Sequence, residues 1–365
     1  MPKQYHKTVS KRLPVPEAIS KDSMKETSHV ESSSLECIEK NSLAESSSQE
    51  HIEESSLPEA ASQSQDKATK KIAIIMRSKN SAWVIANTLA ALNSQDFQDY
   101  ELILVDSGST DATLEIASFY DCRLIEIEPG DYYPGKVLNQ AIEQCQAEVV
   151  VFLNSDAVLL RDDSLTNLLD AFNDPDIVAA FGRQIPRPEA HLWVKRDYAT
   201  SFPATGNPPS WITLSLPFAA IRRQHWQQHP FYQDAWASED TEWGHWAQTS
   251  GYKLAYVPQA LLMHSHNYTL KQVYGRRYVE GEADAFIYHK KHKLTSAISG
   301  FAKGLLRDCF QHMITRDLRG LLFTPSRLFV YHWAYYAGLR WGNTRIRQQI
   351  KNDSTGQRAV LSRYQ

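Results

Sequence analysis

The chain has 365 residues and a formal net charge of −3, with 22% charged and 42% hydrophobic residues. The near-neutral total argues against a simple basic nucleic-acid binder, and the length suits about two domains of ~150 residues. The charge is nevertheless unevenly divided. Residues 71–288 hold 16 Lys and Arg against 27 Asp and Glu, whereas residues 289–365 hold 14 against 3. We therefore expect an acidic central domain and a basic C-terminal region.

Residues 1–70 are rich in serine, with 15 Ser and Tyr5 as the single aromatic residue. Such a segment cannot bury enough apolar surface to offset the entropy of ordering, so we expect a disordered tail. There is no secretory signal and no uncharged apolar run of the ~18–20 residues that a spanning helix needs. The four cysteines are scattered, without metal-binding spacing, which indicates reduced thiols. We expect a cytoplasmic protein, with peripheral contact at the inner face of the plasma membrane as a possibility.

From residue 71 onwards, short apolar runs alternate with segments of helical spacing. The runs predict buried strands and the segments predict helices. The predicted strands are 72–76, 102–105, 123–127 and 148–153, and the predicted helices are 81–91, 113–120 and 137–145. This alternation implies right-handed βαβ units, and therefore an α/β fold with a parallel sheet covered on both faces.

The second half is less regular. Residues 183–217 are rich in proline and predict a long loop region. Further strands are expected at 218–221 and 253–257, and further helices at 239–249 and 270–285. Ser238 precedes the first of these helices and is expected to act as its N-cap.

Polar side chains follow three of the predicted strands. They are Arg77, Lys79 and Asn80 after the first, Asp106 after the second, and Asn154 and Asp156 after the fourth. Ligands of open α/β sheets bind beyond the carboxyl ends of the strands. Asp156 could there hold a divalent cation that also grips a diphosphate, or it could simply belong to a turn.

Two later motifs carry candidate chemistry. Glu239 and Asp240 begin a predicted helix, where one of them could act as a general base or both could compensate the helix dipole. His264 and His266 stand two residues apart. In an extended stretch they lie on opposite faces, so we expect one metal ion to take only one of them.

A third motif, Gly130 to Val137, nearly fits a phosphate-binding loop between a strand and a helix. Val137 replaces the Ser or Thr that would hold Mg²⁺, and Pro134 removes a backbone N–H that a phosphate cradle needs. These residues argue against a phosphate-loop NTPase. Lys136, at a helix start, could still meet a phosphate in another geometry.

Taken in chain order over roughly residues 71–285, these motifs resemble the family 2 glycosyltransferases. The finer texture around Arg77, Gly182 and His264 is similar to bacterial rhamnosyltransferase-like members. The resemblance implies a GT-A fold with a Rossmann-like, mostly parallel sheet, a nucleotide-diphospho-sugar donor and a divalent cation, Mg²⁺ or Mn²⁺. It implies inverting transfer to a hydroxyl group of a polysaccharide or lipid-linked glycan, with no nucleic-acid partner.

The resemblance also implies roles for the candidate residues. Asp240 matches the catalytic base, whereas Asp156 with His264 or His266 matches the metal site. The remaining candidates would contact the donor: Arg77, Lys79, Asn80, Asp106, Lys136, Asn154 and Glu239. Asn154 and Ser107 stand where the family often has carboxylates, and Lys79 where it often has an aromatic residue.

Those departures keep a non-catalytic nucleotide-sugar-binding relative open as an alternative. A nucleotidyltransferase is a further one, although no glycine-rich signature follows the first strand. We expect three parts: a tail (1–70), a glycosyltransferase domain (71–288) and a helical region (289–365). The last part combines aromatic side chains with cations, which suits contact with anionic lipid. Its alternatives are packing on the acidic domain or oligomerisation, and the oligomeric state is left open.

Overall fold

The computed structural model describes residues 71–128, 130, 132–233 and 237–350, which belong to one compact unit, Gln65–Gln365. The tail predicted at 1–70 lies outside the described residues. Three of the cysteines, Cys122, Cys145 and Cys309, lie in the described part and are free thiols.

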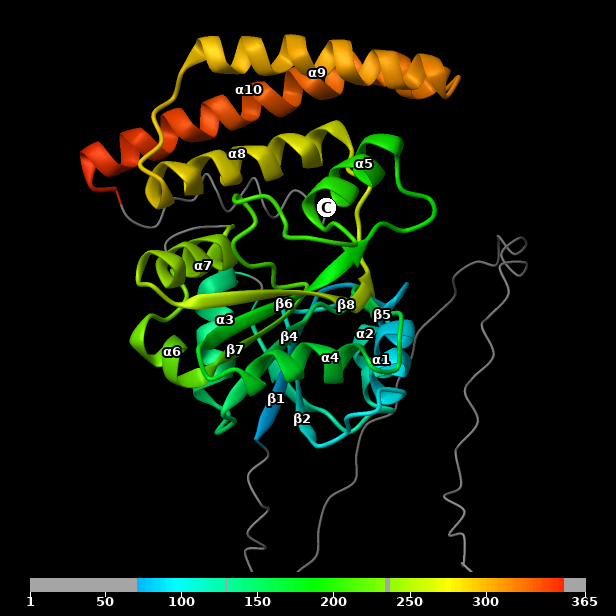
Figure 1. Cartoon of the computed structure of the whole chain (residues 1–365), viewed down its shortest axis with the longest axis vertical. Coiled ribbons are helices and arrows are strands. Elements are labelled where there is room, and N and C mark those ends of the chain that lie inside the picture. The colour runs from blue at the N-terminus through cyan, green and yellow to red at the C-terminus, as the bar shows by residue number, and fades with distance from the viewer. Residues whose placement is uncertain (1–70, 129, 131, 234–236, 351–365) are drawn as a thin grey trace, which may run out of the picture. The chain divides into compact units, whose positions relative to one another are not determined.

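An eight-stranded sheet lies at the centre of the described chain, in the order β3-β2-β1-β4-β7-β6-β8-β5 (Figure 1). The strands are β1 Ile72–Ser78, β2 Tyr100–Asp106, β3 Arg123–Glu126, β4 Val149–Leu153, β5 Val158–Leu159, β6 Ile177–Ile185, β7 Phe218–Arg222 and β8 Lys253–Met263. β1 to β4 pair in parallel, as the alternating pattern predicted. β7 then runs antiparallel to both β4 and β6, which places the second half of the sheet beside the first.

Helices cover both faces of the sheet, because successive strand residues point to opposite sides. Ile74 and Met76 face one layer, formed by α1 (Ile85–Asn93), α2 (Thr113–Ala117) and α4 (Ser164–Asp170). Ala73 and Ile75 face the other, formed by α3 (Pro134–Glu143), α6 (Arg223–Gln228) and α7 (Glu239–Thr249). The two apolar cores fix the sheet edge at which the strands β1, β2 and β4 end.

The expectation of a continuous loop over 183–217 was wrong. Its first residues belong to β6, and α5 (Leu192–Ser201) forms a full helix within it. The prolines explain the error, since Pro186 and Pro188 precede α5 and Pro203 follows it. Proline is compatible with the flanks of a helix although not with its interior, so a composition averaged over the segment hid the helix.

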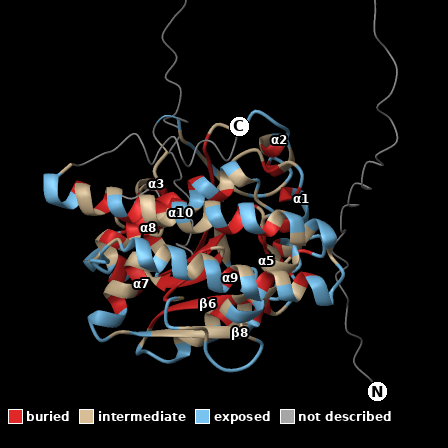
Figure 2. Ribbon diagram, turned by 90° about the horizontal axis from the view of Figure 1, so that it is seen from above, coloured by how far each residue is buried: buried red, intermediate tan, exposed pale blue. Residues whose placement is uncertain are grey.

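Three long helices follow the sheet, and they stack above it in Figure 1. They are α8 Leu270–Ile287, α9 Leu294–Ile314 and α10 Leu318–Gln348. Seen from above, α9 carries exposed residues along its outer side (Figure 2). α8 and α10 approach closely through glycines, because a Cβ added at Gly338 would lie 2.0 Å from the backbone oxygen of Tyr278. None of the described helices combines the length and apolar character needed to cross a membrane.

Candidate active site

The loops after β1 and β2 are joined by a dense set of hydrogen bonds around Asp106. This carboxylate is fully buried and accepts from the hydroxyl of Ser78 at 2.6 Å and from the backbone N–H of Ser109 at 2.6 Å. The Nζ of Lys79 donates to the backbone oxygen of Ser107 at 2.6 Å, and the backbone N–H of Asn80 donates to Ser109 at 2.8 Å. The predicted residues Lys79, Asn80 and Asp106 therefore belong to one hydrogen-bonded network beside the end of β1.

Arg77 connects this network to the second half of the chain. Its guanidinium donates to Glu239 Oε1 at 2.8 Å and to Asn154 Oδ1 at 3.4 Å. Burial lowers the pKa of Arg77, but the interactions of its guanidinium with Tyr132, Glu239 and Asp240 raise it by more. The pKa of Arg77 therefore lies above its ordinary value. An amide at position 154 suits this contact, since its oxygen accepts from the guanidinium without adding a second buried negative charge.

Asp240 lies next to this pair, in the first turn of α7. Its Oδ1 accepts from the backbone N–H of Thr241 at 2.8 Å, and its Oδ2 accepts from that of Leu216 at 3.4 Å. Burial, reinforced by the charge of Glu239, raises the pKa of Asp240 to about 6. A carboxylate with a pKa close to neutrality is suited to accept a proton and to release it again.

Ser238 occupies the N-cap position of α7, as predicted, but it does not cap the helix with its side chain. Its backbone adopts the left-handed conformation, with φ of 69°. This conformation is uncommon for residues other than glycine and carries local strain. Here it turns the chain sharply into α7 and places Glu239 and Asp240 at the end of the sheet.

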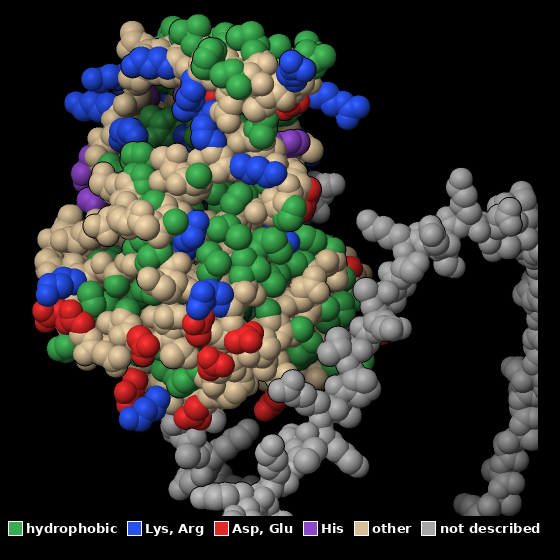
Figure 3. Space-filling view, turned by 45° about the vertical axis from the view of Figure 1, so that its right-hand side comes forward, with side chains coloured by type: hydrophobic (Ala, Val, Ile, Leu, Met, Phe, Trp, Pro, Cys, Tyr) green, Lys and Arg blue, Asp and Glu red, His purple; other side chains and the backbone are tan. Residues whose placement is uncertain are grey.

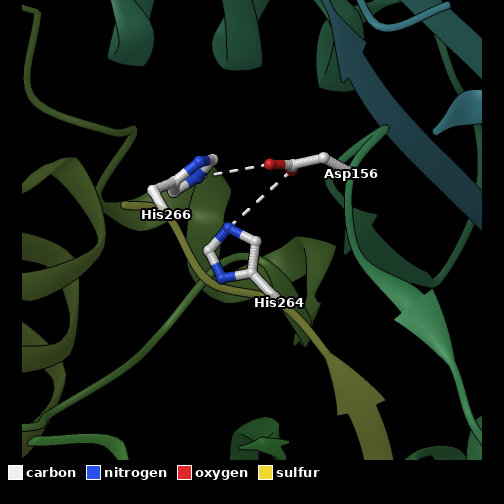
Figure 4. Close-up of side chains that lie close together, drawn as sticks. All are labelled: Asp156, His264 and His266. Atoms are coloured by element: carbon white, nitrogen blue, oxygen red, sulfur yellow. Dashed lines mark ion pairs between the residues drawn. The ribbon is translucent and has the colours of Figure 1, made fainter. Parts of the chain in front are cut away.

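A second cluster joins Asp156, after β4, to His264 and His266, after β8 (Figure 4). His266 Nε2 lies 3.2 Å from one carboxylate oxygen of Asp156, and His264 Nε2 lies 3.7 Å from the other. The potential ligand atoms all lie within 4.8 Å of one another. The expectation that the two histidines point to opposite faces was therefore wrong.

The backbone explains why both imidazoles reach Asp156. The N–H of His264 still bonds to the backbone oxygen of Ile185, but the chain then leaves the strand. Ser265 is held there by the backbone N–H of Arg187, at 2.9 Å from its hydroxyl oxygen. Without regular alternation, the two rings meet edge to face with centroids 5.0 Å apart.

The donor atoms of this cluster fit a divalent cation. Gln184 Oε1 lies 2.9 Å from His264 Nδ1, while its amide nitrogen donates to Ser215 at 2.8 Å. With the amide oxygen of Gln184 turned towards it, Nδ1 of His264 acts as the donor, and a neutral imidazole then presents the lone pair of Nε2 to Asp156. A lone pair and a carboxylate repel unless a proton or a cation lies between them. Burial lowers the pKa of His264, which favours the neutral, ligating form.

The motif around Gly135 has a different role from a phosphate cradle. A Cβ at Gly135 would lie 2.0 Å from the backbone oxygen of Tyr232, so glycine allows α3 to pack against that segment. Asn139, on the same helix, bonds to both backbone groups of Phe231. Lys136 lies in the first turn of this helix, and its place near the donor phosphates stays a prediction.

Two residues of this site escaped the sequence reasoning. Gln184 lay in the segment expected to be a loop, and only its place two residues after Gly182, in the rhamnosyltransferase-like stretch, pointed to it. Arg187 is also buried, and its Nη2 donates to the backbone oxygen of Asp156 at 2.6 Å. Its guanidinium lies over the ring of Trp83, 4.8 Å from the centroid. Cationic and aromatic groups thus border the Asp156 cluster on one side.

A cavity of about 330 Å³ lies beside the other end of the site, between α7 and α8. Tyr232, Ser238, Trp246 and Phe286 are among its lining residues. Ser238 is the N-cap of α7 and immediately precedes Glu239 and Asp240, so the cavity begins next to that cluster. Asp240 itself faces the backbone of Leu216.

The end of the sheet thus carries a buried carboxylate and a candidate cation site in an α/β fold, and the comparisons with known proteins give its family. The model of glycosyl transferase family 2 matches residues 73–239. The chain is 30% identical over 224 residues to the O-antigen chain rhamnosyltransferase RfbN of Salmonella typhimurium, covering 58% of this chain and 71% of that protein. The chain belongs to glycosyl transferase family 2 and is a glycosyltransferase.

Two further proteins resemble the chain. The chain is 32% identical over 203 residues to the O-antigen chain rhamnosyltransferase WbaN of Salmonella anatum, covering 52% of this chain and 64% of that protein. Among solved structures, it resembles the mannosyltransferase PcManGT from Pyrobaculum calidifontis in complex with GDP-Man and Mn²⁺. The TM-score is 0.52 at 17% identity, and the match covers 76% of this chain and 88% of that one. This likeness concerns the fold, which is the GT-A fold that the resemblance to family 2 implied.

Proposed function

We propose that this enzyme transfers a rhamnosyl group from a nucleotide-diphospho-sugar to a hydroxyl group of a polysaccharide or lipid-linked glycan, with inversion at the anomeric carbon. The observation that carries the proposal is the identity of 30% or more to two O-antigen chain rhamnosyltransferases. The arrangement at the strand ends supports it, since a candidate base and a candidate cation site flank the Asn154–Asp156 loop.

Asp240 is the proposed catalytic base. As a carboxylate it takes the proton from the acceptor hydroxyl, whose oxygen then attacks the anomeric carbon while the bond to the diphosphate breaks. Arg77 holds Glu239 by an ion pair of 2.8 Å and so keeps this neighbouring charge fixed beside the base. Glu239 in turn keeps the pKa of Asp240 high enough for proton uptake near neutral pH.

Asp156, His264 and His266 are the proposed ligands of the divalent cation. Two imidazoles and one carboxylate favour Mn²⁺ over Mg²⁺, because Mg²⁺ prefers oxygen ligands alone. The bound cation supplies Lewis-acid stabilisation for the negative charge of the departing diphosphate. Gln184 Oε1 contacts Nδ1 of His264 at 2.9 Å. This contact orients the imidazole so that Nε2, on the other side of the ring, faces Asp156.

The remaining candidates form the proposed donor site. Lys79 and Asn80 follow β1 and Asp106 ends β2, so all three lie at the strand ends beyond which a nucleoside would bind. Arg77 and Asn154, which contact each other, are proposed to bind the diphosphate between the nucleoside and the cation ligands. Lys136 is proposed to approach the same phosphates from the start of α3.

A thermal-shift screen tests the donor and the cation together. The full-length protein is mixed with nucleotide-diphospho-sugars that carry uracil, thymine or guanine, with rhamnose and other sugars, and with Mn²⁺ or Mg²⁺. A ligand that binds only the folded state raises the melting temperature. We expect the largest increase with a rhamnose donor and Mn²⁺, and a transfer assay with that donor should then release the nucleoside diphosphate. A preference for another sugar would refute rhamnosyl transfer, and equal shifts with Mg²⁺ would refute the Mn²⁺ preference.

A further inference from the structure

We propose that the turn between α9 and α10 inserts into the surface of an anionic lipid membrane. Six large apolar side chains are exposed around this turn, and we refer to them as the hairpin tip: Leu306, Phe310, Met313, Ile314, Leu318 and Leu322. Their exposed fractions run from 59% for Met313 to 82% for Leu322. Hydrophobic side chains gather at this end of the molecule in Figure 3, with Lys and Arg beside them. The proposal does not depend on the identity of the transferred sugar.

The spacing of these side chains shows that their exposure is a property of whole helix faces. Leu306, Phe310 and Ile314 recur every four residues along α9, and Leu318 and Leu322 continue the pattern on α10. The opposite face of α9 is the packed one, where Gly304, Asp308 and His312 are buried. Both helices are therefore held in the fold by one face while the apolar tip lies on the other.

The charges around the tip favour an anionic partner. Residues 303–322, which include the hairpin tip, hold four Lys and Arg but only two Asp and no Glu. Both carboxylates are engaged within the fold: Asp308 is buried and pairs with Arg196, Arg307 and Arg327, and Asp317 caps α10 and contacts His312. Lys303, Arg316 and Arg319 are exposed beside the tip. An apolar wedge flanked by cations is the pattern of a helix pair that binds in the lipid interface.

The same charges argue against a second copy of the chain as the occupant. A two-fold interface places a patch against itself, and here Lys303, Arg316 and Arg319 would face the same cations of the other copy. In an anionic bilayer, Phe310 can instead contact the hydrocarbon region while the cations contact the negative headgroups. The proposed contact is peripheral, at the depth of the lipid interface.

Vesicle flotation with the full-length chain tests the apolar part. The vesicles contain phosphatidylcholine with phosphatidylglycerol, or phosphatidylcholine alone. The tip variant carries Phe310→Gln, Ile314→Gln and Leu322→Gln. A matched control removes three apolar side chains that are exposed elsewhere: Phe119→Gln, Leu160→Gln and Trp211→Gln. We expect the wild type and the control to float with the anionic vesicles, and the tip variant to bind at least tenfold more weakly.

A second pair of variants tests the charged part. Lys303→Gln, Arg316→Gln and Arg319→Gln should weaken binding about a hundredfold, at about fivefold for each cation. The matched control, Lys71→Gln, Arg161→Gln and Lys253→Gln, removes three exposed cations of the sheet domain and should leave binding unchanged. Added salt should weaken the binding of the wild type, because exposed charges are screened. All positions are exposed, so melting temperatures should stay within a few degrees of the wild type.

Three results would overturn the proposal. The first is flotation that does not depend on phosphatidylglycerol, and the second is equal flotation of the tip variant and its apolar control. The third is a wild-type dimer in sedimentation equilibrium that the tip variant converts to monomer while flotation is unchanged, since the tip would then be an interface between copies. A failure of rhamnosyl transfer leaves all three measurements unaffected.

Discussion

Replacing Asp240 by Asn should stabilise the protein while abolishing sugar transfer. Burial and Glu239 raise the pKa of Asp240 from 3.8 to about 6, so the folded state holds the proton more tightly than the unfolded state. Stability is therefore lost as the pH rises between these two values. The shift of about two units corresponds to a cost of about 3 kcal/mol at about pH 7.5, and about half of it at pH 5.

Asp240→Asn removes this cost at both pH values. It also weakens one hydrogen bond to a backbone N–H, at about 1 kcal/mol. The net gain in the free energy of unfolding should be about 2 kcal/mol at about pH 7.5 and only about half a kcal/mol at about pH 5. Urea unfolding of the wild type and the variant at both pH values measures the difference. Asp162→Asn, which makes the same charge change at an exposed position, should have no effect beyond about 0.5 kcal/mol. An Asp240→Asn variant that is destabilised at about pH 7.5, or equally affected at both pH values, would refute the reasoning.

Three further predictions concern the site and the helices around it. The transfer rate of the wild type should be about tenfold lower at pH 5 than on its plateau, because a base with a pKa of about 6 is then about 90% protonated; a flat profile from pH 5 to 8 would exclude Asp240 as the titrating base. Gln184→Leu should weaken Mn²⁺ binding, measured calorimetrically, by about 10- to 100-fold, since His264 loses the partner that orients it; unchanged affinity would remove Gln184 from this role. Arg345→Met leaves Glu282 buried without its ion pair of 2.5 Å and should cost about 3–5 kcal/mol in urea unfolding. Adding Glu282→Leu should restore most of that loss, and a double variant as unstable as the single one would contradict this account.

Much of the fold could be predicted from the sequence because the first half repeats one simple pattern. The runs at 72–76, 102–105, 123–127 and 148–153 correspond to β1 to β4 within a few residues. Each βαβ unit is local in sequence, and its handedness is fixed by the twist of the strands. β6 was missed, and the insertion of β7 between β4 and β6 could not be foreseen, since antiparallel pairing between strands so far apart leaves no periodic signal.

The candidate site shows the same division between local and distant information. Asp156 and Asp240 could be proposed from the sequence because they follow a buried strand and begin a helix, respectively. The contact of Arg77 with Glu239 joins residues 162 positions apart in the sequence. The two histidines reach Asp156 only because β8 pairs with β6 in the second half of the sheet. Spacing of i and i+2 predicts opposite faces in a strand, but this rule does not hold beyond the end of β8.

The place of β7 in the sheet has a consequence for synthesis of the chain on the ribosome. β4 is a run of five buried apolar residues, and β7, which covers its free edge, lies 65 residues further along. Because the ribosome adds about 5–20 residues per second, the edge of β4 stays unpaired for roughly 3–13 s before β7 is synthesised. An uncovered apolar edge is a template for pairing with another chain. Nascent chains arrested before residue 218 should therefore pellet more readily than chains arrested after β7 has emerged, and equal pelleting would show that the edge is protected in another way.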